Sequence, residues 1–383
     1  MAQPVDSKLP DIGTTIFTVM SKLAADCGAI NLSQGYPDFA VPERLLERVI
    51  HHLRAGQNQY APMAGIPELR QQIAVKTEHL YGRSTNPDTE VTVTSGATEA
   101  LFSAIEAFIH PGHEVIVFDP AYDSYDPAIR LAGGKAIHIP LQTPGFGIDW
   151  QRVDDAINPA TRMIILNTPH NPTGAVLTSD DLSMLADLVQ NTDIILLGDE
   201  VYEHIIFDQQ PHQSLLLRDD LASRSLAISS FGKTIHATGW KVGYCVAPEN
   251  LTTEFRKVHQ FVQFCVVAPM QYALADFLAN EPEYVIELPK FYQRKRDRFC
   301  ELLAPSRFTF KASAGTYFQL VDYSSISDEP DVDFARRLTR EIGVAAIPVS
   351  VFYERPPPQQ WLRFCFAKGE STLVAATERL CKI

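Results

Sequence analysis

Residues 225–234 read Ser-Leu-Ala-Ile-Ser-Ser-Phe-Gly-Lys-Thr, and residues 239–244 read Gly-Trp-Lys-Val-Gly-Tyr. The first four residues predict a short buried strand, so Lys233 should lie on a turn just past a strand end. Lys241 follows eight residues later. A partly desolvated ammonium loses its proton more easily, so a lysine at such a place can act as an amine nucleophile. The small residues beside Lys233 leave room for a flat cofactor.

Two simpler interpretations of this stretch compete with a nucleophilic lysine. Gly232-Lys233-Thr234 could end a phosphate-binding P-loop, but the glycine required five positions before Gly232 is Ala227, so that motif fails. A solvated surface turn is the other interpretation, and it suits an isolated Gly-Lys pair. The residues in the rest of the chain decide the matter.

Composition restricts the class of protein. With 383 residues, 45% of them hydrophobic and 21% charged, the chain resembles an ordinary soluble enzyme and can form two domains. A formal net charge of -13 argues against nucleic acid or an anionic membrane as the main partner. The sequence shows neither an apolar run of membrane-spanning length nor a signal peptide at its beginning.

Cysteine and histidine usage points to a cytoplasmic protein without a metal site. The six cysteines are scattered and include no CxxC pair, which favours reduced thiols over disulfides or zinc. His110-Pro111-Gly112-His113 contains a Pro-Gly turn and has no third ligand nearby in the sequence, so we expect no metal there.

Helix and strand patterns alternate through most of the chain. Helices are expected over 42–54, 67–81, 97–109, 125–131, 150–157 and 182–189. Strands are expected over 91–93, 114–118, 135–139, 163–166, 194–197, 226–229 and 244–247. Continuous apolar strands that alternate with helices predict an α/β protein with a mostly parallel central sheet, covered by helices on both faces.

The pattern changes at about Pro282. A long helix is expected to run to Leu303, with Arg294, Lys295, Arg296 and Arg298 on a solvated face. Strand, helix and strand patterns follow, and a final helix covers 372–380. We expect three parts: an extended N-terminal arm over 1–42, a large domain over 43–281, and a smaller α/β domain over 282–383 that the arm completes.

Candidate site residues follow the predicted strands, and ligands bind beyond the carboxyl ends of parallel strands. Ser95-Gly96-Ala97-Thr98 joins a strand to a helix, so its backbone N–H groups could hold a phosphate. The stretch 167–174, Asn-Thr-Pro-His-Asn-Pro-Thr-Gly, is either part of a site or a proline-rich turn. Tyr122 could be a core aromatic residue or a platform on which a ring stacks.

Two charged residues lie in apolar surroundings. Asp199, in Asp-Glu-Val-Tyr, follows an apolar strand, where a carboxylate is costly without a cationic partner such as a protonated ring nitrogen. Arg363 lies inside the apolar strand 361–366 and needs an anion, either a substrate carboxylate or a structural salt-bridge partner. An amine, a carboxylate, phosphate donors, an aromatic platform and an arginine together match the requirements of pyridoxal phosphate.

The chain resembles the class I aminotransferases of the fold-type I pyridoxal-phosphate enzymes from Asn31 to Lys368. It is most similar to the branch of methionine, kynurenine–oxoglutarate and glutamine–phenylpyruvate aminotransferases. The motifs in family order are Asn-Gln-Tyr at 58–60, Phe-Asp-Pro-Ala-Tyr-Asp-Ser-Tyr at 118–125, the stretch 167–174, Asp-Glu-Val-Tyr at 199–202, and Gly-Lys at 232–233 with Gly-Trp-Lys-Val-Gly-Tyr at 239–244.

The resemblance implies catalytic and cofactor-binding roles. Lys233 would bind the cofactor covalently as an internal aldimine and then carry the substrate proton. Asp199 would keep the pyridine nitrogen protonated, while Tyr202 and Asn171 would hydrogen-bond the ring oxygen. The remaining cofactor contacts would be Tyr122 stacked on the ring, phosphate donors from Ala97, Thr98, Ser230 and Lys241, and Tyr60 from the neighbouring subunit of a homodimer.

The resemblance also implies a substrate site. Gly35, Asn171 and Arg363 would bind the substrate carboxylate, and Phe17 and Tyr36 would border the side-chain pocket. Val266-Val267 replaces the Phe-His pair of the kynurenine branch, which favours methionine as the amino donor, with glutamine, aromatic amino acids or histidine also accepted. The sequence shows no second, side-chain-reading arginine like that of the aspartate enzymes.

Other activities of such a site stay open. Cysteine-S-conjugate β-lyase activity would use the same first step, and kynurenine–oxoglutarate transamination is a further alternative as the main role. A ligand-sensing transcription regulator keeps this fold but carries a DNA-binding domain ahead of it, which the short arm and the net charge of -13 do not favour.

Overall fold

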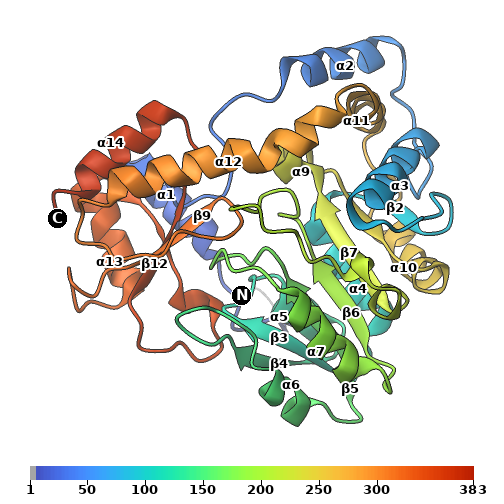
Figure 1. Ribbon diagram of the computed structural model, residues 1–383, viewed down its shortest axis with the longest axis horizontal. Coiled ribbons are helices and arrows are strands. Elements are labelled where there is room, and N and C mark those ends of the chain that lie inside the picture. The colour runs from blue at the N-terminus through green and yellow to red at the C-terminus, as the bar shows by residue number, and fades with distance from the viewer. Residues whose placement is uncertain (1–5) are drawn as a thin grey trace, which may run out of the picture.

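A seven-stranded sheet forms the centre of the larger lobe (Figure 1). The computed structural model describes residues 6–383, so the first five residues of the expected arm lie outside the described residues. The strands are parallel except β8, which runs antiparallel to both neighbours. Their order is β2 (Val91–Thr94), β8 (Gly243–Val246), β7 (Ser225–Ser230), β6 (Ile195–Asp199), β5 (Thr161–Asn167), β3 (Glu114–Asp119) and β4 (Lys135–Pro140).

Both faces of this sheet are covered because its strands are apolar on both sides. Successive residues enter opposite cores: Val115 and Val117 pack towards α4 (Gly96–Phe108), whereas Ile116 packs towards α7 (Ser179–Val189). The other helices of this part are α2 (Glu43–Arg54), α3 (Pro67–Tyr81), α5 (Tyr125–Leu131), α6 (Trp150–Ala156), α8 (Asp219–Ala222), α9 (Phe231–Thr234), α10 (Glu249–Val262) and α11 (Ala268–Asn280), with 3₁₀ turns η1 (Leu215–Leu217) and η2 (Thr238–Trp240). The predicted α/β class with a mostly parallel central sheet is confirmed.

The smaller lobe is built around a three-stranded antiparallel sheet. Its strand order is β11 (Ile347–Pro348), β12 (Trp361–Cys365) and β9 (Phe318–Asp322). A separate parallel pair joins β1 (Ile30–Asn31) to β10 (Val344–Ala345), so an early segment of the chain lies beside a late one. The surrounding helices are α1 (Ile16–Cys27), α12 (Pro282–Leu303), α13 (Asp331–Arg337), the π-helical turn η3 (Leu338–Ile342), η4 (Ser350–Phe352) and α14 (Glu370–Leu380).

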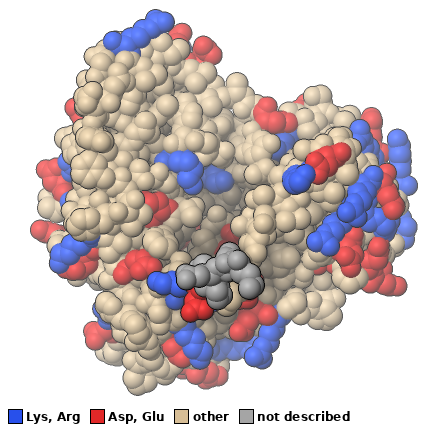
Figure 2. Space-filling view, turned by 180° about the vertical axis from the view of Figure 1, so that it is seen from behind, with Lys and Arg blue, Asp and Glu red and all other residues tan. Residues whose placement is uncertain are grey.

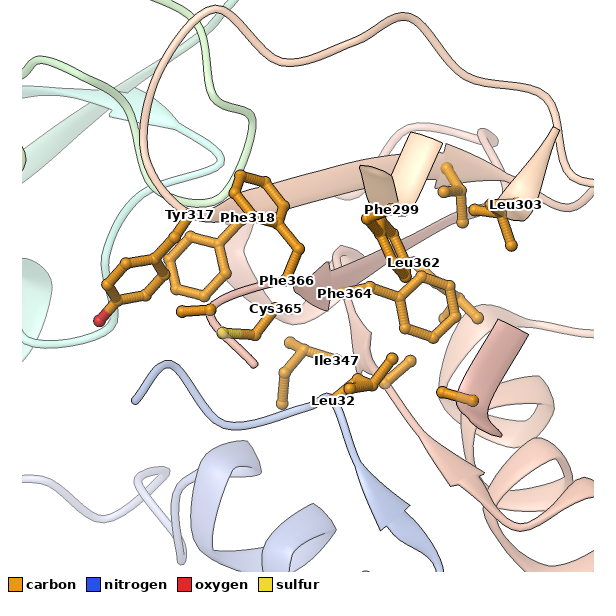
Figure 3. Close-up of a cluster of buried hydrophobic side chains, with 14 of the residues drawn as sticks. Leu32, Phe299, Leu303, Tyr317, Phe318, Ile347, Leu362, Phe364, Cys365 and Phe366 are labelled. Atoms are coloured by element: carbon orange, nitrogen blue, oxygen red, sulfur yellow. The ribbon is translucent and has the colours of Figure 1, made fainter. Parts of the chain in front are cut away.

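Aromatic side chains fill the core of this lobe. Figure 3 shows Phe299 of α12 and Phe364 of β12 inside the cluster, with Tyr317 and Phe318 at one edge. The helix α12 runs from beside α11 to beside α14 and so connects the two lobes (Figure 1). The space-filling view shows a hollow between the lobes, and acidic and basic side chains are interspersed on the face seen (Figure 2).

Two expectations about the chain were wrong. The N-terminal arm is not extended throughout, because α1 forms there: the Thr15 side chain caps its start, Met20 and Ala24 are buried, and Gly28 ends it at φ 61°. Arg296 is not on a solvated face of α12, because its guanidinium is buried and paired with Asp208. Lys295 is half-buried and donates a hydrogen bond to the Lys368 carbonyl.

The sequence pattern also missed α10 and α11, which lie on the large lobe. None of the helices in residues 6–383 combines the length and the apolar character that crossing a bilayer requires.

The backbone around Gly243 of β8 packs closely against β7 and the start of α4. An added Cβ would lie 2.8 Å from the Ser229 carbonyl oxygen and 2.9 Å from the Ala97 nitrogen, and both are backbone atoms that cannot rotate away. We expect Gly243→Ala to lower the free energy of unfolding by about 2 kcal/mol, measured by chemical denaturation. The control is Gly145→Ala, where an added Cβ has no neighbour within 4 Å. Equal stability of the two variants would contradict this packing.

Candidate active site

A cavity of about 330 Å³ lies at the carboxyl ends of the parallel strands, where it also reaches the smaller lobe. Its lining includes thirteen of the residues that the sequence singled out: Phe17, Gly35, Tyr36, Ala97, Thr98, Tyr122, Asn171, Asp199, Tyr202, Ser230, Lys233, Lys241 and Arg363. The fold therefore brings together residues from eight separate parts of the sequence. A larger surface depression of about 800 Å³ lies among residues at the opposite ends of β5 and β6 and contains none of them.

Lys233 projects into this cavity from α9, the single helical turn that follows β7. Its Nζ donates a hydrogen bond to the Tyr317 hydroxyl at 2.8 Å and lies 3.4 Å from the Gly35 carbonyl oxygen. Burial lowers the pKa of Lys233 to about 8, and the nearby cations Arg363 and Lys241 act in the same direction. The amine is thus available as a nucleophile near neutral pH.

Asp199 is the last residue of β6 and is 4% exposed. The Tyr125 hydroxyl donates a hydrogen bond of 2.5 Å to its Oδ2, but Oδ1 has no hydrogen-bond partner within the described part of the chain. Burial raises the pKa of Asp199 to about 6. A buried carboxylate oxygen without a donor is unfavourable, so Oδ1 fits an N–H group of a bound molecule.

The start of α4 and Lys241 form an anion-binding end of the cavity. Gly96 has φ 75°, and a Cβ added there would lie 3.1 Å from Lys241 Nζ, so the lysine closes over the helix start. Ala97 and Thr98 present the first-turn backbone of a 13-residue helix, and Ser230 lies at the neighbouring strand end. Unpaired N–H groups at a helix start, together with a lysine, suit a phosphate group.

Arg363 is 1% exposed, and no acidic side chain in residues 6–383 forms an ion pair with it. Its Nη1 donates to Asn171 Oδ1 at 2.7 Å and its Nη2 donates to the Ser33 carbonyl at 2.9 Å, while Nε lacks a partner among the described residues. The guanidinium lies 3.8 Å from the ring centroid of Phe318. Burial lowers the pKa of Arg363, so the site favours an anionic ligand that compensates the charge.

Two tyrosines complete the cavity. Burial raises the pKa of Tyr122 to about 12, and burial likewise raises the pKa of Tyr202 above its usual value. Both hydroxyls therefore stay protonated and can donate hydrogen bonds.

Tyr60 is the one predicted site residue that the chain does not bring into the cavity. It is 83% exposed and its ring packs against Phe264. The sequence also missed Tyr125, Tyr317 and Phe318, which contact Asp199, Lys233 and Arg363 respectively. Tyr125 ends the motif at 118–125 but received no role there, and no motif includes Tyr317 or Phe318, because their importance comes from where the folded chain points their side chains.

The family model for aminotransferases of class I and II matches residues 28–380. The chain belongs to this family.

Individual relatives cover almost the whole of the aminotransferase. The methionine aminotransferase of Escherichia coli is 54% identical over 374 residues, which are 98% of this chain and 97% of the relative. Kynurenine–oxoglutarate transaminase 3 of mouse is 34% identical over 97% of this chain and 88% of its own. The crystal structure of YbdL from Escherichia coli, described as having a methionine aminotransferase function, matches with a TM-score of 0.98 at 53% identity over 100% of both chains.

A more distant solved structure has the same fold. The aspartate aminotransferase of Thermus thermophilus with maleate has a TM-score of 0.90 at 30% identity over 100% of both chains. The enzyme is therefore an aminotransferase of fold type I, which depends on pyridoxal phosphate.

The residues present fit this cofactor. The unpaired Oδ1 of Asp199 offers an acceptor for the protonated ring nitrogen, and the Gly96–Lys241 end offers donors for the phosphate. Lys233 offers the amine that the aldehyde group requires. Each chemical feature of the cofactor thus has a complement in one cavity. No group of three or more His, Cys, Asp or Glu side chains within residues 6–383 could hold a metal ion.

Asp199 predicts a dependence of stability on pH in the cofactor-free protein. Its pKa of about 6 in the folded protein lies above the usual value of 3.8, so its stabilising contribution is complete below about pH 4 and is lost as the pH rises through 6. Asp199→Asn removes this titration, so the variant should be more stable than the native protein at pH 7.5, on the order of 2–3 kcal/mol. The difference should disappear towards pH 4 in thermal unfolding.

Pyridoxal phosphate should reverse the order of stability of the native protein and Asp199→Asn. Added pyridoxal phosphate should raise the melting temperature of the native protein more than that of Asp199→Asn, because an amide does not favour a protonated ring nitrogen. Asp154→Asn, at an exposed position, is the control and should change neither curve. A stability difference that does not vary with pH would show that Asp199 does not titrate in this range.

Proposed function

We propose that this aminotransferase transfers the amino group of an L-amino acid, methionine above others, to a 2-oxo acid. The observation that carries the proposal is the cavity wall: Arg363 is its only arginine among the described residues, and Phe17, Tyr36 and Phe318 supply apolar surface next to it. An unbranched thioether fits such a wall better than a second carboxylate does. The 54% identity with a methionine aminotransferase supports the same donor. Glutamine, aromatic amino acids and histidine are proposed as further donors.

The proposed roles at the carboxylate end follow from unpaired donors. Arg363 binds the substrate carboxylate, because it is a buried cation whose Nε has no partner among the described residues. Asn171 accepts from Arg363 through Oδ1, which leaves its amide N–H₂ free to donate into the cavity. Gly35 offers its backbone beside Phe318, where a Cβ would lie only 2.6 Å from the ring. Phe17 and Tyr36 border the substrate side chain.

The remaining roles concern the cofactor and the proton. Pyridoxal phosphate supplies an electron sink for the negative charge that develops on the substrate α-carbon. Lys233 binds the cofactor and moves the proton at its Nζ, and Asp199 holds the ring N–H through Oδ1. Tyr202 and Asn171 donate towards the ring oxygen, and Tyr122 stacks on the ring. Ala97, Thr98, Ser230 and Lys241 hold the phosphate.

The proposal includes a homodimer with shared active sites. Phe261 is 87% exposed and Phe264 is 56% exposed, and with Val262, Val267 and Tyr60 they form an apolar set of surface residues near the C-terminal end of α10. Exposed aromatic residues that cluster in this way are typical of an interface. Tyr60 from one subunit would reach the phosphate in the site of the other.

The proposed domain division follows the pairing of segments. Residues 43–281 form the large, cofactor-binding domain, and residues 282–383 form the small domain with the arm over 1–42. The pairing of β1 with β10 supports this division, because it joins the arm to the later segment. The cytoplasmic location and the lack of nucleic-acid and membrane partners stay predictions from the sequence.

A donor screen tests the substrate proposal. Purified enzyme with pyridoxal phosphate is supplied with methionine, glutamine, phenylalanine, histidine, kynurenine and aspartate, each against several 2-oxo acids. Methionine should give the highest kcat/KM, and aspartate should fall at least roughly tenfold below it, because its second carboxylate would lose hydration without gaining a cationic partner. Kynurenine or aspartate as the best donor would refute the assignment. Release of pyruvate and ammonia from a cysteine conjugate without any 2-oxo acid would identify β-lyase activity instead.

Phe261→Asp tests the dimer. The native enzyme should have twice the chain mass in analytical ultracentrifugation, and the variant should dissociate because a buried carboxylate in the interface is unfavourable. Dissociation should also weaken cofactor binding, because Tyr60 of the partner is lost. Met184→Asp on α7 alters a second exposed apolar side chain, 47% exposed, and should leave the mass unchanged. A native enzyme that sediments as a monomer would contradict the shared site.

A further inference from the structure

Tyr317 is a fully buried residue at the boundary between the two lobes, and it has no role in the proposals above. It immediately precedes β9, and its backbone carbonyl accepts a hydrogen bond from the Phe366 N–H at 3.0 Å, so its main chain belongs to the smaller lobe. Its side chain points out of the smaller lobe, towards Lys233. Figure 3 shows the hydroxyl of Tyr317 pointing away from the other labelled side chains of the cluster.

The turn before Tyr317 is strained and closely held. Thr316 has φ 64°, a conformation that β-branched residues rarely adopt and that persists only where the surroundings enforce it. The Thr316 N–H donates to the Ile205 carbonyl at 2.8 Å, and the Gly315 N–H donates to the Gly174 carbonyl at 2.9 Å. Ile205 lies in the segment that follows Asp199 at the end of β6, and Gly174 lies in the segment after β5 that contains Asn171. The direction of the Tyr317 side chain is thus set by the large lobe that contains the site.

The Tyr317 hydroxyl joins three separate segments. It donates its single proton to the Gly35 carbonyl at 2.6 Å, so its oxygen faces Lys233 as an acceptor, and Lys233 Nζ donates to it at 2.8 Å. Nζ also lies 5.3 Å from the Tyr317 ring centroid and 5.4 Å from that of Tyr202. The two rings meet edge to face, with centroids 5.1 Å apart, and leave the amine little freedom to turn.

The acceptor of the tyrosine proton is also held in place. The Gly35 backbone packs against Phe318, and the next carbonyl, that of Tyr36, accepts a hydrogen bond from Lys368 Nζ at 2.8 Å. The Tyr317 O–H therefore stays directed at the Gly35 carbonyl. If it turned towards Lys233, its proton would face the N–H groups of the amine, and two donors would meet.

The amine has other ionisable neighbours on β6, on β12 and in the turn before β8. They act in both directions: Arg363 and Lys241 disfavour the ammonium, whereas Asp199 favours it. Burial raises the pKa of Cys365, which stays a neutral thiol. None of these four donates to or accepts from Nζ directly, so among the described residues the oxygens of Tyr317 and Gly35 are its only hydrogen-bond partners.

We propose that Tyr317 is a positioning residue for the Lys233 amine: whenever that nitrogen is not bonded to the cofactor, the Tyr317 hydroxyl accepts its hydrogen and holds it at one place between the two aromatic rings. The proposal rests on the proposed role of Lys233. It implies that the smaller lobe takes part in proton transfer through the amine and not only in binding the carboxylate. An amine held at one place approaches the substrate α-carbon in a single orientation, whereas an amine that rotates freely spends most of its time in unproductive orientations.

The test uses the full-length enzyme with pyridoxal phosphate and the variant Tyr317→Phe, which removes only the hydroxyl. In single turnovers with methionine, followed by the absorbance of the cofactor, the rate constant should fall about tenfold or more, as expected for the loss of one hydrogen bond to a charged group. The dissociation constant of 4-(methylthio)butanoate, a carboxylate without an amino group, should change less than about twofold because Arg363 is intact.

The pH profile separates positioning from packing. An acceptor stabilises the ammonium, so its removal should move the limb that reports Lys233 to lower pH by about half a unit or more. The control is Tyr323→Phe, because Tyr323 is equally buried in the smaller lobe and donates its proton to the Glu329 carbonyl at 2.7 Å. This control should have the native rate and the native profile.

Three outcomes would overturn the proposal. Tyr317→Phe with a native rate and pH profile would show that its hydroxyl only fills space, and a loss of analogue binding as large as the loss of rate would place Tyr317 in the carboxylate site. The third outcome concerns Lys233 itself and is tested by borohydride reduction. An adduct on the Lys233 peptide in the native enzyme and in Tyr317→Phe supports the role of the lysine independently of Tyr317. Its absence in the native enzyme would refute that role and the present proposal with it.

Discussion

Two buried charges of opposite sign face one cavity, and neither finds its complement in the described protein. Asp199 keeps one carboxylate oxygen without a donor, and Arg363 keeps its Nε without an acceptor. Burial disfavours the charged form of each, which is visible in the raised pKa of Asp199 and the lowered pKa of Arg363. Strands of two separate sheets carry the two side chains and hold them apart, so that ligands can supply the missing partners.

The sheet explains why the proposed cofactor residues gather, and the contact between the lobes explains why the proposed substrate residues join them. Asp199 and Lys233 follow neighbouring parallel strands, and Lys241 precedes the single antiparallel strand, whose beginning lies at that same edge. Arg363 comes from the middle of β12 in the other sheet. The proposed cofactor residues thus lie on one lobe, whereas the proposed substrate site and the contact of Tyr317 with Lys233 involve both.

Much of this arrangement could be predicted from the sequence. The helices α3, α5 and α12 have the predicted bounds. Pro67 and Gly82 mark the two ends of α3, and Pro282 marks the start of α12. For α7 the prediction began three residues late, since the Thr178–Asp181 capping box precedes the apolar pattern. The prediction missed α1 and its Thr15 and Gly28 ends because Pro4 and Pro10 suggested an extended arm. Arg296 looked solvated because Asp208, its partner, lies 88 positions away.

The site shows the same limit. Residue type singled out Lys233, Asp199 and Arg363, and the predicted junction of a strand with a helix singled out the backbone of Ala97 and Thr98. Tyr125 ends a motif and Tyr317 lies outside every motif, but the contacts of both depend on side-chain orientation, which a one-dimensional pattern does not contain. The order of these residues along the chain also has a consequence for biosynthesis. Lys233 leaves the ribosome about 130 residues before Arg363. A nascent chain would therefore complete the strands next to Asp199 and Lys233 while Arg363 is still untranslated, so one charged wall of the cavity is synthesised well before the other.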